Sequence, residues 1–290
     1  MQSTTTDPLV SVLIPTFNRP DLLRLAVKSV LDQTLEDLEV IVIDDASAND
    51  NRRLVEEFND DRISYVRHDT NKGLPGARNT GVRLARGKFV AFLDDDDHWM
   101  PDKLEQQLRY IDGYEAAVCG FFVNTLDRPC VEHRLNKVDL RQLRKGNRFP
   151  PSGLMVRTEV IKRLEFDESL TFSEDWDALL RIAAQYRIRY VSKPLFVKTV
   201  DQHATMTSAL KQMTMDDLES QLRAIEKSKG LLGSYWYRYR KAARFLSYIG
   251  VRTDRLERIA YTVGCCGLVP AAHVLMDRFT AKLGRIVGPS

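Results

Sequence analysis

Four short apolar runs, each followed by a segment with helical character, dominate the first 111 residues. The runs are rich in β-branched or aromatic side chains and occupy residues 10–15, 39–44, 63–67 and 88–93. Helices are expected at residues 21–31, 51–58, 77–85 and 101–111. Pro20 and Pro101 stand where a proline opens a helix. This alternation predicts a mostly parallel sheet covered by helices, with a binding crevice beyond the carboxyl ends of its strands.

The pattern is less regular from residue 113 onward and suggests only helices after residue 215. Strands are expected at residues 117–123 and 153–156, and a pair of strands over 189–200 that breaks at Pro194. Helices are expected at residues 139–143, 159–163 and 174–185, the last with Ser173 as its N-cap. We therefore predict an α/β protein with a helical C-terminal extension over residues 216–290.

Four consecutive aspartates, Asp94 to Asp97, directly follow the fourth apolar run. Carboxylates gathered at the end of a strand repel one another unless a cation compensates their charge. In an extended segment alternate side chains share a side, so Asp94 and Asp96 are expected to point together and Asp95 elsewhere. Carboxylate oxygens are ligands suited to Mg²⁺ or Mn²⁺. The alternative is a solvated acidic turn in which Asp97 caps the next helix.

Three longer segments follow one another in order. They are VSVLIPTFNRPDLLRLAVKSVLDQT from residue 10, VIVIDDASAND from residue 40 and NKGLPGARNTGVRLARGKFVAFLDDDDHWMPDKLEQQ from residue 71. This combination resembles the family 2 glycosyltransferases, inverting enzymes with the GT-A fold, strongly over residues 9–112 and more weakly to about residue 208. The resemblance implies a Rossmann-like nucleotide-binding mixed sheet flanked by helices. It implies a catalytic domain over residues 1–215, with a nucleotide-binding half at 1–112 and an acceptor-binding half at 113–215.

The resemblance gives donor-binding roles to residues that follow the first two apolar runs. Pro15, Thr16 and Asn18 would border the nucleotide, and Asp45 would accept the N3–H of a uracil-like base. A carboxylate suits that contact because it only accepts hydrogen bonds. The alternative for Asp45 is that it caps the helix after Asn49.

Arg78 lies in the glycine-rich segment NKGLPGARNTG, which lacks the Lys-Ser/Thr ending of a P-loop. The resemblance places Arg78 near the nucleotide and the diphosphate. A cation in the first turn of a helix is locally unfavourable, and recruitment of a phosphate would explain its position. The alternative is a surface arginine paired with an acid such as Asp69.

The resemblance also implies a metal site that includes the aspartate run. Asp96 matches the metal-binding aspartate of the D-x-D motif, with Asp94 as its partner and Asp95 near the ribose or the donor sugar. His203 matches a histidine near the metal, and the implied cofactor is Mn²⁺ or Mg²⁺. Many members carry Tyr-Arg-x-His there, whereas this chain has VDQH at residues 200–203, so a structural histidine remains an alternative.

Inverting transfer needs a base that deprotonates the acceptor hydroxyl. In the family this base is the aspartate of a Glu-Asp motif at the start of a helix. Glu174 and Asp175 match this motif. Asp175 is therefore the expected base. The helix N-terminus would lower its pKa, while a nearby diphosphate and Asp96 would raise it. Both acids would also satisfy the helix dipole without any role in catalysis. Trp99 and Trp176 are expected in the core, with a sugar pocket as the alternative.

The four cysteines show no CxxC or zinc spacing, so we expect reduced thiols. The polar N-terminus does not resemble a signal peptide, which favours a cytoplasmic protein. Residues 233–290 carry ten Lys or Arg against three Asp or Glu, although the whole chain has a formal charge of only +3. Aromatic and basic residues alternate over 234–250, and residues 259–276 are uncharged. This tail predicts peripheral binding to an anionic membrane surface; packing on the catalytic domain, or a homodimer through these helices, is the alternative.

We predict a metal-dependent inverting glycosyltransferase, a hexosyl- or related sugar transferase that builds a bacterial surface polysaccharide or lipopolysaccharide. The expected partners are a nucleotide-sugar donor, with UDP-sugars favoured, and a glycan or lipid-linked glycan acceptor at the inner face of the cytoplasmic membrane. Nucleic acid is not expected, because no recognition motif accompanies the basic tail. A nucleotidyltransferase that makes sugar nucleotides and a non-catalytic nucleotide-sugar-binding module are the alternatives.

Overall fold

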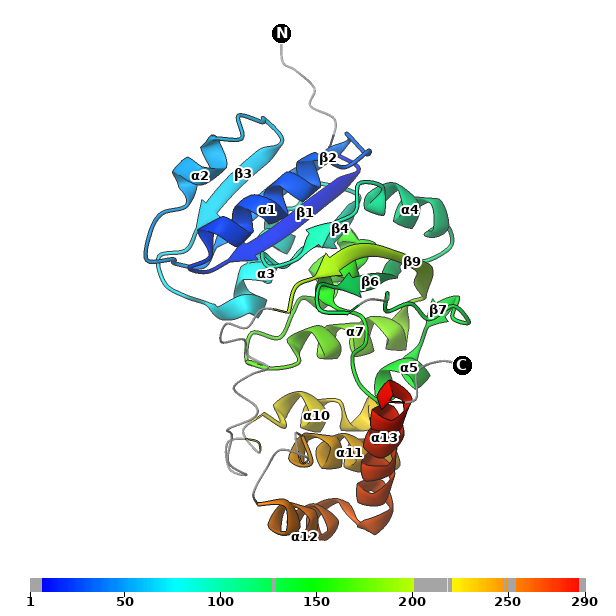
Figure 1. Ribbon diagram of the computed structural model, residues 1–290. Helices are drawn as coiled ribbons and strands as arrows, with labels where there is room; N and C mark the ends of the chain where they lie inside the picture. The colour runs from blue at the N-terminus through cyan, green and yellow to red at the C-terminus, as the bar shows by residue number, and fades with distance from the viewer. Residues whose placement is uncertain are drawn as a thin grey trace. The chain divides into compact units, whose positions relative to one another are not determined.

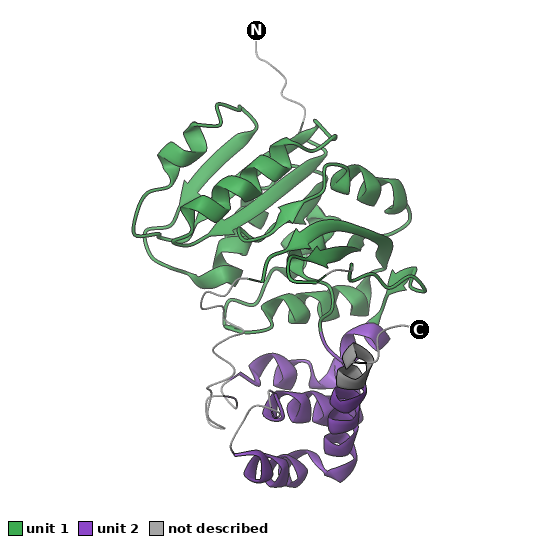
Figure 2. Ribbon diagram, viewed as in Figure 1, with its two compact units in different colours: residues 1–139, 147–200 green, residues 140–146, 201–290 purple. Residues whose placement is uncertain are grey.

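The computed structural model describes residues 7–126, 129–200, 218, 221–247, 249 and 254–286, with side chains to residue 280. The chain divides into two compact units, Met1–Asp139 with Asn147–Val200 (unit 1) and Leu140–Gly146 with Asp201–Ser290 (unit 2) (Figure 2). Unit 1 contains the sheet, and unit 2 is helical where it is described (Figure 1). The boundary expected at residue 215 lies outside the described residues and stays a prediction.

Unit 1 is built on one mixed sheet. Its described strands are β1 (Val10–Thr16), β2 (Leu38–Asp44), β3 (Ile63–Arg67), β4 (Phe89–Phe92), β5 (His98–Trp99), β6 (Ala116–Val123), β7 (Lys137–Val138), β8 (Met155–Arg157) and β9 (Ile188–Lys198). Their order is β3-β2-β1-β4-β8-β6-β9-β5, and β7 also pairs with β9. The strands β1 to β4 are parallel, whereas β8 is antiparallel to β4 and β6. The carboxyl ends of β1, β2 and β4 therefore meet at one edge.

Helices cover both faces of this sheet (Figure 1). Those described in unit 1 are α1 (Pro20–Leu31), α2 (Arg52–Glu56), α3 (Gly73–Leu84), α4 (Lys103–Tyr110), α6 (Thr158–Leu164) and α7 (Glu174–Gln185), with a 3-10 turn at Pro151–Gly153. The buried side of α1 packs against Val12 and Ile14 of β1. The alternate residue Leu13 faces α3, where a Cβ at Gly81 would lie 3.0 Å from its side chain. Gly81 thus lets α3 lie close to the sheet.

The structure confirms most of the expected elements in unit 1, with ends shifted by a few residues, and corrects three details. Residues 188–198 form one strand and not a broken pair, because a register shift against β6 accommodates Pro194. The helix expected from Ala77 begins at Gly73 instead, since Pro75 fits the first turn, where its missing N–H has no helical partner. Ser173 does precede α7, but it has a left-handed backbone and its side chain makes no capping hydrogen bond.

The described part of unit 2 consists of helices. They are α5 (Leu140–Arg144), α10 (Arg223–Lys227), α11 (Lys229–Phe245), α12 (Arg255–Cys266) and α13 (Leu268–Ile286). Gly267, with φ 87°, separates α12 from α13 and divides the uncharged run of residues 259–276 between them. No helix in the described part of the chain combines the length and the apolar character that a bilayer crossing requires.

Candidate functional site

The aspartate run forms a turn beyond the end of β4. The strand ends at Phe92, and the Asp97 N–H donates to the Asp94 carbonyl over 3.0 Å. The alternation expected of an extended segment is therefore absent. Asp94 pairs with Arg78, whereas Asp95 and Asp96 both accept from Arg19 Nη1, at 3.3 and 3.0 Å.

A nearby positive charge stabilises the ionised carboxylates of Asp95 and Asp96. Thr16 Oγ1 donates to Asp95 Oδ2 over 2.8 Å, which joins the end of β1 to this turn. Burial raises the pKa of Asp95 to about 6, against the opposing effects of Thr16 and Arg19. Burial and the charge of Asp94 also raise the pKa of Asp96, whose side chain is 26% exposed and therefore reachable from solvent. A further cation beside Asp96 would relieve this repulsion.

Arg78 links the aspartate turn to the start of α7. Its guanidinium is buried and donates to Asp94 Oδ1 over 2.6 Å and to Glu174 Oε1 over 2.8 Å. The guanidinium carbon lies 5.4 Å from the centre of the Phe166 ring. Burial favours the neutral form, yet Asp94 and Glu174 raise the pKa of Arg78. The alternative of a surface arginine paired with Asp69 is wrong, because the side chain is enclosed between two other acids.

Asp175 follows Glu174 in the first turn of α7. Asn147 Nδ2 donates to Asp175 Oδ2 over 2.7 Å, and the Trp176 N–H donates to Oδ1 over 2.7 Å. Burial raises the pKa of this carboxyl group, although Arg78 opposes the shift. The effect of burial on the pKa of Asp175 thus outweighs that of the helix N-terminus. The sequence alone did not decide between these two effects. The carboxylate is oriented by two donors and has a basicity above that of an ordinary aspartate.

One residue of this site, Lys198, was not found from the sequence, and Asp97 has a role other than the helix cap considered there. Asp97 accepts from Ser152 Oγ over 2.6 Å and from the Thr199 N–H over 2.9 Å, so it anchors two chain segments and does not cap α4. His98 pairs with Val197 in the antiparallel register of β5 and β9, which brings Lys198 opposite Asp97. Burial disfavours the charge of Lys198, but Asp97, Asp94, Asp96 and Asp175 together raise its pKa. A local sequence pattern does not reveal such a pairing.

Asp45 lies buried at the end of β2. Its Oδ1 lies 2.7 Å from His68 Nδ1 and accepts from the Lys72 N–H over 2.8 Å. His68 Nε2 lies 2.9 Å from Thr80 Oγ1. These contacts hold the carboxylate in one orientation, and no described residue donates a hydrogen bond to Oδ2, which can accept from a ligand. Asp45 does not cap α2, the helix after Asn49, in contrast to the alternative drawn from the sequence, because its Oδ1 is bonded to His68 and to the Lys72 N–H.

Of the other residues expected at the site, the structure describes Pro15 and Asn18 but not His203. Pro15 lies buried in β1, and Asn18 joins the loops after β1 and β2, since its Oδ1 accepts from the Ala48 N–H over 2.7 Å. His203 lies outside the described residues. Within the described part of the chain, no three His, Cys, Asp or Glu side chains gather as a metal cluster. Trp99 and Trp176 are buried, as expected for core residues.

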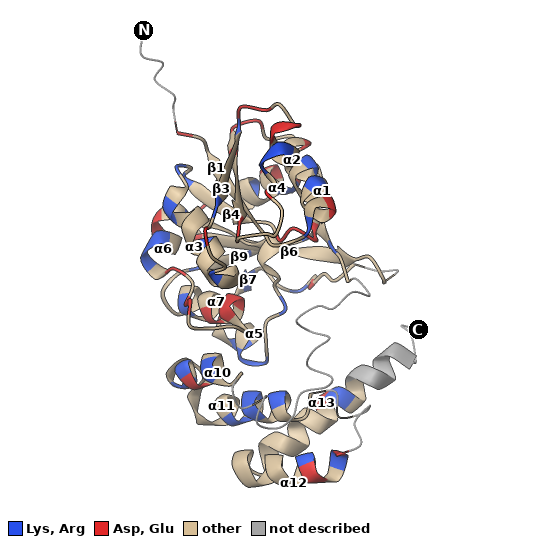
Figure 3. Cartoon of the chain, turned by 90° about the vertical axis from the view of Figure 1, so that its left-hand side faces the viewer, with Lys and Arg blue, Asp and Glu red and all other residues tan. Residues whose placement is uncertain are grey.

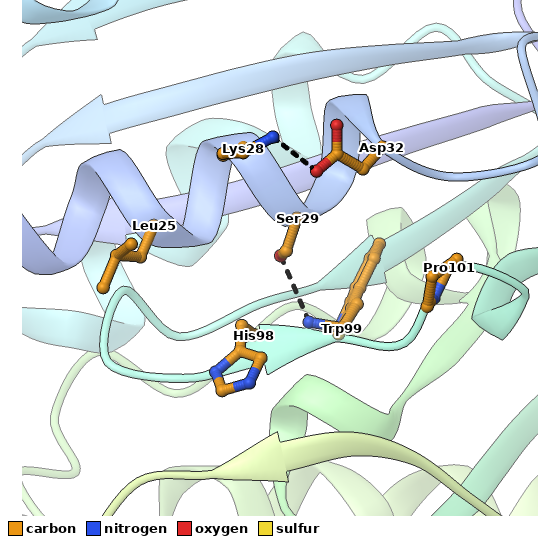
Figure 4. Close-up of a pocket in the computed structure, with 7 residues that line it drawn as sticks. All are labelled: Leu25, Lys28, Ser29, Asp32, His98, Trp99 and Pro101. Carbon is orange, nitrogen blue, oxygen red and sulfur yellow. Dashed lines mark hydrogen bonds and ion pairs between the residues drawn. The ribbon is translucent and has the colours of Figure 1, made fainter.

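A hollow of about 290 Å³ lies beside α1 and does not include the aspartate turn in its lining. Figure 4 shows Lys28 and Ser29 of α1 on one side and His98 and Trp99 of β5 on the other. The Trp99 N–H donates to Ser29 Oγ over 3.1 Å, which fixes β5 against α1. We assign no part of the donor site to this hollow, because the strand-end carboxylates lie outside it.

Comparison with known proteins identifies related chains. Residues 11–163 match the family model described as glycosyl transferase family 2. The uncharacterized glycosyltransferase MJ1057 of Methanocaldococcus jannaschii is 28% identical over 72% of this chain and 76% of its own length. An Escherichia coli relative, UDP-Glc:alpha-D-GlcNAc-diphosphoundecaprenol beta-1,3-glucosyltransferase WfgD, is 43% identical over 35% of this chain. That match spans only 40% of WfgD.

Solved structures show the same fold. S. aureus TarS 1-349 in complex with UDP-GlcNAc has a TM-score of 0.69 at 21% identity, over 89% of this chain and 81% of that one. The mannosyltransferase PcManGT from Pyrobaculum calidifontis, in complex with GDP-Man and Mn²⁺, has a TM-score of 0.62 at 20% identity, over 97% and 81%. The GT-A type architecture expected from the sequence, with helices after it, is thereby confirmed.

Proposed function

Because the chain belongs to glycosyl transferase family 2, and is thus a glycosyltransferase, we propose that it transfers a sugar from a UDP-linked donor to an acceptor hydroxyl with inversion. The observation that carries this proposal is the buried Arg78, which ties the aspartate turn after β4 to the Glu174-Asp175 start of α7. One side chain thereby fixes the expected donor residues relative to the expected base. We further propose that the product belongs to a bacterial surface polysaccharide or lipopolysaccharide, made from a glycan or lipid-linked acceptor. WfgD, which by name acts on a diphosphoundecaprenol-linked sugar, supports this pathway.

Asp175 is the proposed base. Asn147 and the Trp176 N–H orient its two oxygens, and burial keeps its pKa above the ordinary aspartate range. A base whose pKa is closer to the working pH takes up the proton of an attacking hydroxyl more readily. The acceptor hydroxyl would lose its proton to Asp175 as its oxygen attacks the anomeric carbon from the side opposite the leaving diphosphate.

The donor contacts are proposed at the strand ends. The available oxygen of Asp45 suits the N3–H of uracil, while Pro15, Thr16 and Asn18 border the same edge. Arg78 acts here as a positioning residue, because both of its acidic partners belong to the site. TarS with UDP-GlcNAc and WfgD with its UDP-Glc name support a UDP-sugar. PcManGT binds GDP-Man, so the fold alone does not determine which nucleobase the donor carries.

The aspartate turn fits a divalent cation such as Mn²⁺ or Mg²⁺. The donor set consists of hard carboxylate oxygens, and the mutual repulsion of Asp94, Asp95 and Asp96 would fall on cation binding. We propose Asp96 as the principal ligand, with Asp94 beside it and His203 as a further candidate. When bound, such a cation would stabilise the charge of the leaving nucleoside diphosphate.

Replacing Asp96 with Ala is expected to weaken Mn²⁺-dependent binding of UDP by at least about tenfold, because a metal-ligating carboxylate is lost. Isothermal titration with UDP, with and without Mn²⁺, measures this. The matched control is Asp112→Ala, an exposed aspartate on the loop after α4. Hydrolysis of a panel of nucleotide sugars tests the proposed function itself. Tight UDP binding with no turnover of any donor, with or without Mn²⁺, would instead favour a binding module.

Peripheral membrane binding is proposed for unit 2. Leu256 of α12 and Leu268, Val269, Met276 and Phe279 of α13 are large apolar side chains that are exposed. Exposed apolar residues on basic helices suit the interface of an anionic bilayer. This proposal accords with a cytoplasmic enzyme at the inner face of the membrane.

Replacing Leu268 and Phe279 together with Glu is expected to reduce sedimentation of the full chain with phosphatidylglycerol vesicles by at least about tenfold, because two side chains lose apolar burial. Leu84→Glu, at an exposed position of α3 in unit 1, is the matched control. If the parent protein never sediments with vesicles, membrane binding fails. Dimers that dissociate in the Glu variant during ultracentrifugation would then assign these residues to a homodimer.

A further inference from the structure

His68 connects the carboxylate of Asp45 to α3. Asp45 and His68 directly follow the paired strands β2 and β3. Figure 3 shows α3 on one face of this sheet, with α1 on the other. His68 Nδ1 lies 2.7 Å from Asp45 Oδ1, and its Nε2 lies 2.9 Å from Oγ1 of Thr80, a residue of α3. Asp45 and His68 are both buried, so a continuous series of hydrogen bonds runs from the edge of the sheet to this helix.

Two donors use one oxygen of Asp45. An ionised carboxylate only accepts hydrogen bonds, so the hydrogen in the contact with His68 is on Nδ1. The Lys72 N–H donates to the same oxygen, Oδ1, over 2.8 Å. A carboxylate offers about four lone-pair positions on its two oxygens, so these two donors fill Oδ1. Within the described part of the chain, the other oxygen, Oδ2, accepts no hydrogen bond. Asp45 therefore has one oxygen left for a ligand.

A single available oxygen distinguishes nucleobases by the number of N–H groups on their pairing edge. Uracil and thymine present one imide N3–H between two carbonyl groups. Guanine presents N1–H and an N2 amino group side by side, and these match both oxygens of a carboxylate at once. At Asp45 the second donor of guanine would meet an oxygen whose lone pairs are already used. A buried donor without a partner is costly, so guanine should bind about tenfold or more weakly than uracil.

We propose that His68 and Thr80 are positioning residues through which Asp45 selects uracil or thymine over guanine. This inference rests on the proposed function, in which Asp45 meets the nucleobase of the donor. His68 occupies Oδ1, and Thr80 holds the imidazole ring in the orientation that this contact needs. The methyl group of thymine lies away from its imide edge, so Asp45 does not distinguish it from uracil. The donor class is therefore a nucleotide sugar that carries either of these two bases.

The test is isothermal titration of the full chain with UDP, GDP and CDP, and with dUDP and dTDP, all in the presence of Mn²⁺. UDP is expected to bind at least about tenfold more tightly than GDP. The affinities for dTDP and dUDP, which both lack the 2′-hydroxyl, should agree within about threefold, because the imide edge is the same. Equal binding of UDP and GDP would overturn the selectivity and leave donor binding intact. If no nucleotide binds, the proposed function fails and this inference fails with it.

Substitutions of His68 test its part in the selection. His68→Leu removes one donor from Oδ1 and is expected to lower the preference for UDP over GDP by about tenfold. His68→Asn can still donate from a position close to Nδ1 and should keep most of the preference. His133→Leu, at an exposed position outside this site, is the matched control and should change nothing. Equal preferences in folded His68→Leu and His133→Leu would overturn the role of His68.

Substitutions of Thr80 keep the proposal testable if His68→Leu does not fold, which thermal melts reveal. Thr80→Val nearly keeps the shape of the side chain but removes the partner of His68 Nε2, so the preference for UDP should fall. Thr80→Ser retains the hydroxyl and should keep it. Identical preferences in these two variants would overturn the role of Thr80.

CDP distinguishes a change in selection from a loosened pocket. Cytosine has a lone pair at N3, which a carboxylate repels whether or not Oδ1 is occupied. CDP should therefore remain a weak ligand in the parent protein and in the variants of His68 and Thr80. A gain in GDP affinity alone supports the proposal. A parallel gain in the affinities for GDP and CDP would contradict it, because general loosening of the pocket would then explain the result.

Discussion

Asp175→Asn is expected to lower kcat for sugar transfer by about 10²- to 10⁴-fold, the range typical for loss of a general base. The substitution keeps the shape of the side chain but removes its negative charge and its basicity, and it replaces one of the two acceptor oxygens with an amide donor. Binding of UDP should remain close to that of the parent protein, because the expected donor contacts lie at the strand ends and in the aspartate turn. Single-turnover transfer and UDP titration on the same preparations separate the two effects.

The matched control for this prediction is Asp21→Asn. Asp21 also lies in the first turn of a helix, but on α1, and is exposed. The pH dependence adds a second readout. Burial raises the pKa of Asp175, and the base must be deprotonated to act, so kcat of the parent should fall as the pH drops through that raised value. Turnover of Asp175→Asn at the parent rate would remove Asp175 as the base.

The sequence predicts the parts of this protein that depend on local patterns. Alternating apolar runs and helical segments indicate β1 to β4 and α1, and the bounds of α7 agree at both ends. Periodicity and turn residues act over a few positions, so they suffice for these elements. The same reasoning fails at Asp94–Asp97, because the strand ends earlier than an extended run would suggest and the turn regroups the side chains.

The contacts that assemble the candidate site join residues distant in sequence. Arg78 and Glu174 are 96 positions apart, and Ser152 reaches Asp97 across 55. Lys198 approaches the aspartates only because β9 pairs with the short strand β5. No spacing rule in one sequence encodes such pairings. The family resemblance indicated that Arg78 belongs to the site, but its partners came from the three-dimensional arrangement.

Arg78 is therefore the residue whose loss should most affect the folded structure. Its guanidinium is enclosed, and its two partners, the carboxylates of Asp94 and Glu174, are largely buried. Removing one member of a buried ion pair leaves the remaining charges without compensation, which costs more than the pair itself contributes. Burial already raises the pKa of Glu174, although Arg78 opposes that shift. Without Arg78, the carboxyl group of Glu174 would favour protonation, and both carboxylates would favour exposure to water.

Arg78→Met is expected to lower the free energy of unfolding at pH 7 by about 3–5 kcal/mol. Urea denaturation measures this. Arg83→Met on the same helix is the control, because Arg83 pairs with Glu165 and Glu168 at 53% exposure and should cost less than about 1 kcal/mol.

The pH dependence of stability and a second substitution test whether loss of the buried ionic link causes the destabilisation in Arg78→Met. In Arg78→Met the folded-state pKa of Glu174, already raised by burial, rises further above its unfolded value, so the loss of stability should be largest above that pKa and shrink as the pH falls through it. Adding Glu174→Gln to Arg78→Met should recover part of the lost stability, because one uncompensated charge is removed. Equal costs for Arg78→Met and Arg83→Met, or no recovery at low pH, would contradict a buried ionic link. The start of α7, and with it Asp175, would then have to be positioned by packing alone.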